Sequence, residues 1–336
     1  MNSKLFACIL LFPTLCLPAP ATLQLYEAIE PHMGTLMRIK LYASNEASAK
    51  QAFRAAFDRI AQLDEILSDY NPNSELSRVA AAAFSKPVPV SNDLARVLEA
   101  SQQIAAQTNG AFDITVGPLT HLWRQARHDH LVLQPAAVQE ALARCGYRKL
   151  HLDRAAQTIQ LDSPQMLLDV GGIAKGYAAD EALAVLEKLG LPKALVAASG
   201  DLAFGDAPPD EPGWKIGIDS FDRADKPFTR VLYLANAAVS TSGSTEQSLE
   251  INGKTYSHII DPKTGMGLVD NMTVTTIARQ GMQADAAATA VSVLGCKKGL
   301  AYVDREPDLA AFIVVKNHGQ TRSFASNRFQ QMNFAH

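Results

Sequence analysis

The chain has 336 residues, of which 47% are hydrophobic and 19% are charged, and its formal net charge at pH 7 is -3. This composition indicates a globular protein with a sizeable core and argues against a disordered one. The weakly acidic balance gives no electrostatic footprint for nucleic acid, and no apolar run beyond the N-terminus reaches the roughly 20 residues that a membrane span needs.

The N-terminus has the pattern of a secretory signal peptide. Lys4 precedes an apolar stretch, and the small residues of segment 19–21 follow it as a cleavage site. We therefore expect residues 1–21 to be a signal peptide and residues 22–336 to be the mature domain, exported to the periplasm. A buried N-terminal strand is the alternative. A lipid anchor at Cys16, which would attach the protein to the inner membrane, also stays open.

The cysteines place few constraints on the fold. Export would remove Cys8 and Cys16 with the signal and would leave Cys145 and Cys296. These two residues lie far apart in the sequence, so one disulfide and two free thiols are equally open. No Cys-x-x-Cys motif or cluster of His and Cys indicates zinc.

The first part of the mature chain is predicted to be mainly helical. A strand is expected at 33–43, and apolar residues at intervals of three and four predict an amphipathic helix over 46–67. The turn-forming segment YNPNSE (70–75) ends this helix. A second helix is expected over 92–108, with Asn92 as its cap, and a third helix over 135–144.

Strands dominate the predicted second half. Short strands at 148–153, 157–161 and 166–170 precede a helix over 174–189 that ends at Gly190. The later elements are a helix over 283–294 and strands at 194–199, 214–219, 229–239, 255–260, 272–279 and 309–316. Helices early and strands late are typical of an α+β fold, here with antiparallel sheets.

The stretch LLDVGGIAKGYAAD (167–180) has features of a phosphate-binding loop. An apolar run leads into Asp169, two glycines and a helix that carries Lys175. Glycine lets a backbone approach a phosphate closely, and a helix N-terminus favours an anion. The spacing is not that of the Walker motif, and no Ser or Thr follows Lys175. An ordinary strand–turn–helix with a surface lysine is an equally good interpretation.

Three other residues have both a functional and a structural interpretation. Asp113 follows a helix end, where it can line a site or cap the next helix. Tyr70 stands at a turn, where it can stack on a planar ligand or close the preceding helix. His258 lies on an expected strand, where a lone histidine is more often structural than catalytic.

Asp285 stands in the alanine-rich segment MQADAAATAVSVLG (282–295). On a helix, Asp285 and Thr289 share one face because they are four residues apart. A buried carboxylate without a partner is costly, so a partner is expected. One carboxylate and one hydroxyl suit Mg²⁺, which usually binds one or two protein groups together with substrate phosphates. A carboxylate that only stabilises the helix dipole is the alternative.

Eight stretches, in their order along residues 33–295, resemble the ApbE family of FAD:protein FMN transferases. The stretches are Met33-Gly34-Thr35, SDYNPNSELSR, GAFDITVGPLTHLW, LDVGGIAKGYAAD, SGD, STSGS, YSHIIDPKTG and ADAAATAVSVLG. Each alone is a weak signal, whereas eight in order are very specific. One departure is Ser199-Gly200, where members of this family commonly have two glycines.

The resemblance implies a bilobed α+β fold, with mixed or antiparallel sheets flanked by helices and a flavin site in the cleft. The residues that it places at the FAD site are Met33, Tyr70, Ala111, Phe112, Asp113, Asp169, Lys175 and Ile259. The metal ligands that it implies are the carbonyl of Gly172 and the side chains of Asp285 and Thr289, so Mg²⁺ would be the partner of Asp285. His258 is the candidate general base, because histidine titrates near neutral pH.

The function that the resemblance implies is Mg²⁺-dependent transfer of FMN from FAD to a Thr or Ser hydroxyl, with release of AMP. The acceptor would be an exported or membrane flavoprotein, such as a subunit of a membrane redox complex. An FAD pyrophosphatase that gives FMN and AMP is the first alternative. A flavin-binding carrier without chemistry is the second, although the pair Asp285 and Thr289 argues against it. The sequence identifies neither the acceptor nor the oligomeric state.

Overall fold

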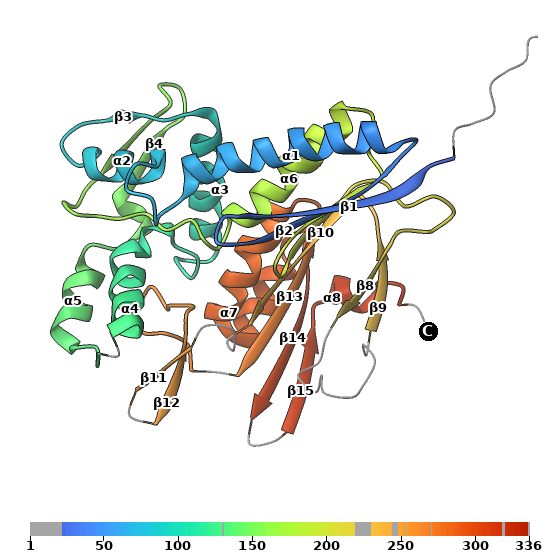
Figure 1. Ribbon diagram of the computed structural model, residues 1–336. Coiled ribbons are helices and arrows are strands. Elements are labelled where there is room, and N and C mark those ends of the chain that lie inside the picture. The colour runs from blue at the N-terminus through green and yellow to red at the C-terminus, as the bar shows by residue number, and fades with distance from the viewer. Residues whose placement is uncertain are drawn as a thin grey trace, which may run out of the picture.

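The structure is a computed structural model that describes residues 22–129, 131–218, 230–243, 248–251, 253–269, 271–317 and 320–334. The expected signal peptide (1–21) lies outside the described residues, and so do the expected strand limits at 219 and 229. Figure 1 shows a large sheet with long helices on one face and a smaller, mainly helical lobe at one side. The expected α+β class, with antiparallel sheets flanked by helices, is confirmed.

Within the described residues the largest sheet has eight strands, and each neighbouring pair is antiparallel. In spatial order the strands are β1 (Gln24–His32), β2 (Thr35–Ala43), β6 (Ala194–Ala198), β7 (Asp201–Phe204), β10 (Ala237–Gly243), β13 (Met272–Ala278), β14 (Ala310–Asn317) and β15 (Gln320–Ala325). The interior strand β13 is buried along most of its length, because both faces of the sheet are covered.

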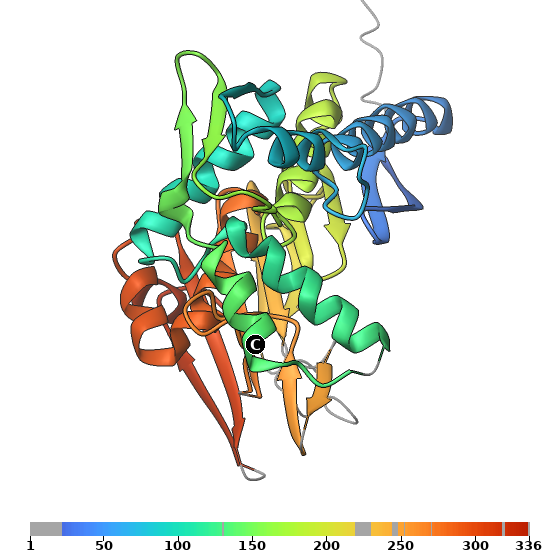
Figure 2. The same cartoon turned by 90° about the vertical axis from the view of Figure 1, so that its left-hand side faces the viewer.

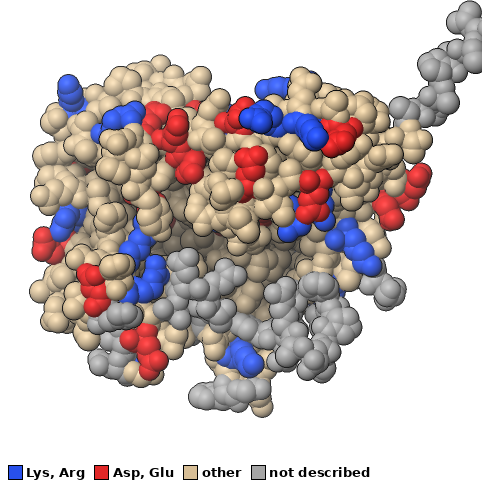
Figure 3. All heavy atoms as spheres, viewed as in Figure 1, with Lys and Arg blue, Asp and Glu red and all other residues tan. Residues whose placement is uncertain are grey.

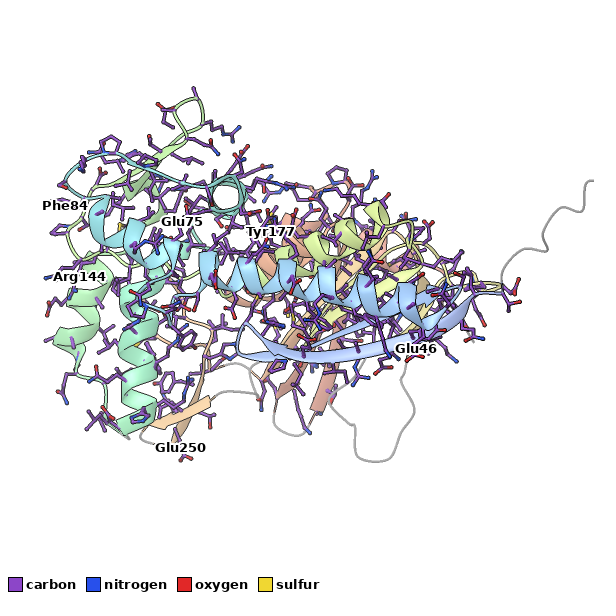
Figure 4. The ribbon with its side chains drawn as sticks, turned by 45° about the horizontal axis from the view of Figure 1, so that its top comes forward. Glu46, Glu75, Phe84, Arg144, Tyr177 and Glu250 are labelled. Atoms are coloured by element: carbon purple, nitrogen blue, oxygen red, sulfur yellow. The ribbon has the colours of Figure 1, made fainter. Side chains whose placement is uncertain are left out.

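Three long helices cover one face of this sheet. They are α1 (Glu46–Leu67), α6 (Ala174–Lys188) and α7 (Gly281–Val303), and their apolar sides join the main core. Seen from above, α1 runs lengthwise from Glu46, and Tyr177 of α6 lies beside it (Figure 4). α7 bends at Gly295, whose φ of 72° is a left-handed conformation that glycine adopts without strain.

The opposite face of the sheet is covered by a hairpin of β8 (Trp214–Ile218) and β9 (Arg230–Leu234), and by the short helix α8 (Asn327–Gln330). This second core explains one wrong prediction, the single strand at 229–239. The chain turns at Asn236, which has a φ of 50°, and β9 and β10 therefore belong to different sheets.

The side lobe supplies the remaining elements. Its helices are α2 (Glu75–Ala82), α3 (Asn92–Gln107), α4 (Gly117–Asp129) and α5 (Pro135–Ala143), with 3₁₀ turns η1 (Ile114–Val116) and η2 (Tyr147–Lys149). Its strands are β3 (Val88–Pro89), β4 (Leu150–Asp153) and β5 (Thr158–Leu161), which form a small sheet. The hairpin of β11 (Ser248–Ile251) and β12 (Lys254–Ser257) lies against α4 (Figure 2).

The predicted strand at 166–170 is wrong. These residues belong to no strand, and the N–H of Asp169 donates to the carbonyl of Ile114 at 2.7 Å. A Cβ added at Gly117 would lie 2.5 Å from the carbonyl of Leu167. The segment therefore packs against the start of α4 and positions Asp169 directly before α6.

Gly176→Ala is expected to lower the free energy of unfolding by about 3 kcal/mol, because overpacking a rigid contact is costly. The α6 and α7 backbones touch at this residue, and an added Cβ would lie 2.1 Å from the carbonyl oxygen of Gly281. Urea unfolding measures the change. Gly243→Ala is the matched control, since its Cβ would meet nothing closer than Thr273 Oγ1 at 3.9 Å. Equal losses in both variants would contradict this account of the α6–α7 contact.

Several negative expectations can be compared with the described residues. Acidic and basic side chains alternate over the face in Figure 3, without a continuous basic patch. No helix in the described part of the chain is long and apolar enough to cross a membrane. No disulfide joins Cys145 and Cys296.

Candidate active site

Most of the predicted site residues meet in a cavity of about 200 Å³, which we call the main cavity. It lies between the helix-covered sheet and the side lobe. Among the described residues, its lining comes from segments 111–120, 169–175, 199–201, 240–243, 258–262 and 285–289. A roomier cavity of about 550 Å³ near Asp180 and Arg279 contains none of the predicted site residues.

Three charged side chains in the lining of the main cavity lie together, and we call Lys175, Asp201 and Asp285 the charge cluster. Nζ of Lys175 lies 2.9 Å from Asp201 Oδ2 and 3.6 Å from Asp285 Oδ2. Asp201 accepts a hydrogen bond from Ser240 Oγ at 2.5 Å, and Asp285 accepts one from the Gly176 N–H at 3.1 Å. Two carboxylates thus share one ammonium.

The charge cluster has perturbed acid–base properties. Burial raises the pKa of Asp285, the charge of Asp201 raises it further, and Lys175 offsets this only in part. Burial alone would lower the pKa of Lys175, but Asp285 and Asp201 outweigh burial and raise it. Lys175 therefore stays protonated at neutral pH.

Two helix starts bring these groups together. Lys175 lies in the first turn of α6, three residues after Gly172, while Asp285 and Thr289 lie on successive turns of α7. Asp180 of α6 accepts the N–H groups of Gly281 and Met282 at 2.7 and 3.0 Å and so caps α7. Burial raises the pKa of this carboxyl to about 6. The cap and the Gly176 contact fix α7 relative to α6.

The residues present fit a magnesium ion. A Cβ added at Gly172 would lie 2.9 Å from Thr289 Oγ1, so the Gly172 backbone and the Thr289 hydroxyl are adjacent. With Asp285 they offer a carbonyl, a hydroxyl and a carboxylate, the hard oxygens that Mg²⁺ prefers. No group of three His, Cys, Asp or Glu side chains in the described residues suits a metal. An ion here would therefore need such mixed donors together with ligand phosphates.

A second cavity of about 160 Å³, the outer cavity, adjoins the main cavity. The two share lining residues, including Asp169 and His258. The other walls of the outer cavity include Tyr70, Trp123, Arg124, Arg127, Leu249 and Tyr256. His258 thus stands where the polar main cavity meets an aromatic and basic space.

The structure brings most of the predicted residues to these cavities. The main cavity is lined by Ala111, Phe112, Asp113, Asp169, Gly172, Lys175, His258, Ile259, Asp285 and Thr289. Tyr70 lines only the outer cavity. Met33 lines neither cavity, and its N–H donates to Asp64 Oδ2 at 2.9 Å. The ligand roles of all these residues stay predictions.

Asp113 and Asp169 use their carboxylates within the fold. Asp113 accepts the N–H and hydroxyl of Thr115 at 2.8 and 2.7 Å, and the N–H of Tyr147 at 2.8 Å. It therefore caps η1, as its structural interpretation proposed. Asp169 accepts the Gly171 N–H at 2.8 Å and Arg124 Nη2 at 3.0 Å, which shapes the glycine turn before α6.

Sequence reasoning missed Asp201, Ser240 and Arg124 as site residues. The stretches SGD and STSGS contain Asp201 and Ser240, but the pairing of β7 with β10, which joins them, is not visible in the sequence. Ser199 has a φ of 57°, a conformation that favours glycine. Ser199 is the departure named in the sequence analysis, and its backbone has a conformation that glycine adopts without strain.

The sequence is similar to a known family over most of its length. A sequence profile described as the ApbE family matches residues 33–313. An FAD:protein FMN transferase from Klebsiella pneumoniae is 33% identical over 306 residues, which cover 89% of this chain and 86% of the relative. Another from Treponema pallidum is 34% identical over 305 residues, covering 86% and 84%.

Solved structures resemble this one closely. The flavin transferase ApbE from Vibrio cholerae superposes with a TM-score of 0.83 at 27% identity, over 93% of this chain and 100% of that one. The apo form of the flavinyl transferase ApbE from Pseudomonas stutzeri gives a TM-score of 0.80 at 27% identity, over 92% and 97%.

Proposed function

The chain belongs to the ApbE family, and from this premise we propose that it is an FAD:protein FMN transferase that acts with Mg²⁺. In this reaction a Thr or Ser hydroxyl of an acceptor flavoprotein attacks the phosphorus on the FMN side of FAD. A new P–O bond to the acceptor forms, the P–O bond to the AMP phosphate breaks, and AMP leaves.

The charge cluster is the observation that supports this proposal most directly. A diphosphate resists a nucleophile because its oxygens are negative, and its cleavage needs positive charge held in place. Lys175 is kept protonated between Asp201 and Asp285, at the start of α6, where the positive end of the helix dipole also favours an anion. Mg²⁺ bound by Asp285, Thr289 and the Gly172 carbonyl would neutralise phosphate charge and orient the diphosphate.

The other residues of the two cavities have roles that follow from their positions. His258 lines both cavities, so its imidazole can take the proton of the acceptor hydroxyl. Tyr70 is 72% exposed and offers a ring face to the flavin. Asp169 and the glycine turn that it holds would face the nucleotide.

The acceptor is proposed to be an exported or membrane flavoprotein, such as a subunit of a membrane redox complex. The support is the signal-like sequence at 1–21, which indicates a periplasmic protein, free or attached to the inner membrane. Detection of the protein in a periplasmic extract, with its N-terminus determined, tests this location. A cytoplasmic protein that retains residue 1 would contradict it.

One incubation separates the candidate reactions. The protein without residues 1–21 is mixed with FAD, MgCl₂ and a Thr-containing exported flavoprotein, and intact acceptor mass and free AMP are measured. A gain of one FMN by the acceptor, with one AMP released, is expected. FMN and AMP in solution with an unmodified acceptor would instead identify a pyrophosphatase. FAD that stays bound and uncleaved would identify a carrier.

A further inference from the structure

Arg124 of α4 joins three segments that are far apart in the sequence, and sequence reasoning did not single it out. We propose that Arg124 is a positioning residue that holds the Tyr70 ring as a fixed stacking platform for the flavin ring of the substrate. This inference rests on the proposed function, because it assigns the flavin ring to the outer cavity.

The contacts of Arg124 involve one face of its guanidinium and both of its terminal nitrogens. Nη1 donates to Asp69 Oδ2, and Nη2 donates to Asp169 Oδ2 at 3.0 Å. Its guanidinium carbon lies over the Tyr70 ring, 4.1 Å from the ring centre. Asp69 and Tyr70 follow the end of α1, while Asp169 precedes α6. One side chain thus fixes the tyrosine loop relative to the glycine turn.

Burial and charge make these contacts firm. The side chains of Arg124, Asp69 and Asp169 are 24%, 13% and 10% exposed, so water screens their ion pairs less than it would at the surface. Burial raises the pKa of Asp69, and the charge of Asp169 raises it further, so the two carboxylates need their shared cation. Lysine could not replace arginine here, because its single ammonium lacks the two separate nitrogens with which Arg124 bridges both carboxylates above the Tyr70 ring.

The position of Tyr70 leaves one face of its ring available to a ligand in the outer cavity. The residue is 72% exposed, and it lines the outer cavity next to His258. Arg124 covers one face of the ring, so the opposite face is the one left for a ligand. An exposed tyrosine that populates several rotamers loses side-chain conformational entropy when a ligand binds. A ring that a cation already holds in one rotamer does not. Fixing Tyr70 in advance therefore favours binding of a planar ring.

The test measures the affinity of the protein for FAD and for FMN by the quenching of flavin fluorescence. FMN is included because it lacks the diphosphate bond that the proposed reaction breaks. Arg124→Met is expected to weaken binding of both about tenfold, because a cation–π contact and a preorganised ring are lost. Arg96→Met is the matched control. Arg96 also pairs with a carboxylate, that of Glu181 at 3.0 Å, and lies over the ring of Tyr177, but it lines neither cavity.

A double-mutant cycle shows whether Arg124 acts through the tyrosine. Tyr70→Ala alone should weaken flavin binding about as much as Arg124→Met, and the combined variant should be little weaker than either. Additive losses would overturn the proposal. If Arg124→Met does not fold, Arg124→Lys decides, since it keeps the charge but cannot bridge both carboxylates. If the Arg124 variants bind FAD and FMN as tightly as the wild type does, the inference alone is overturned. If the wild-type protein binds neither FAD nor FMN, the proposed function is overturned as well.

Discussion

Asp285→Asn is expected to lower FMN transfer by about 1,000-fold or more, the scale on which metal-centred electrostatic stabilisation acts. Asparagine keeps the shape of the side chain and can still accept the Gly176 N–H, but it removes the charged ligand expected for Mg²⁺. The loss should persist at MgCl₂ concentrations that saturate the wild type. The loss is measured as a lower rate of FMN addition to the acceptor, followed by the intact mass of the acceptor.

The same substitution is expected to leave the metal-free protein as stable as the wild type, or more stable. Burial raises the pKa of Asp285 above its value in the unfolded chain, so the folded state binds its proton more tightly. The Asp285 carboxyl therefore lowers the free energy of unfolding as pH rises from acid to neutral and the group loses its proton. Asp285→Asn is expected to remove this loss, so its stabilising effect should appear only toward neutral pH. Thermal unfolding in EDTA at pH 5 and pH 8 measures the difference.

Ser292→Ala is the matched control on the same helix. Ser292 is buried two turns after Asp285, and its hydroxyl donates to the carbonyl of Ala288 at 2.8 Å, away from the charge cluster. It should retain transfer activity. A fully active Asp285→Asn variant would refute the metal assignment. An inactive variant that is also much less stable in EDTA would show that Asp285 is needed for the fold.

The parts of the fold that the sequence predicted are those with local signals. Helix α1 was predicted at the residues where it occurs, because its apolar residues repeat at helical spacing and the turn-forming segment YNPNSE follows it. Strand β1 was missed, since as an edge strand it exposes most of its residues and shows no apolar alternation. The strand predicted at 166–170 failed because an apolar run does not reveal whether a partner strand is present.

The candidate site shows the same limit. Lys175 and Asp285 were predicted because each stands in a recognisable stretch at the start of a helix. Their mutual distance of 3.6 Å depends on the Gly176–Gly281 contact, and the closer partner Asp201 depends on the order of strands in the sheet. Arg124 carries no motif at all, and only the packing of α4 against two other segments gives it a role.

Lys175→Met is expected to lower transfer about 100-fold or more, since it removes a fixed positive charge from the diphosphate site. It should also destabilise the metal-free protein by about 3–5 kcal/mol, because breaking a buried ion pair leaves charge uncompensated. Asp201 and Asp285, both largely buried, would then lie together without their cation. Lys188→Met, at the exposed end of α6, is the control that should change neither property.

Magnesium should reverse part of that instability, which distinguishes a metal site from a simple salt bridge. An ion that binds only the folded state stabilises it in proportion to its affinity. Removing Lys175 concentrates negative charge next to Thr289 and the Gly172 carbonyl, so MgCl₂ should raise the unfolding temperature of Lys175→Met more than that of the wild type. Equal shifts would mean that the ion does not bind at Asp285, and that Lys175 is only the structural counter-ion of two buried carboxylates.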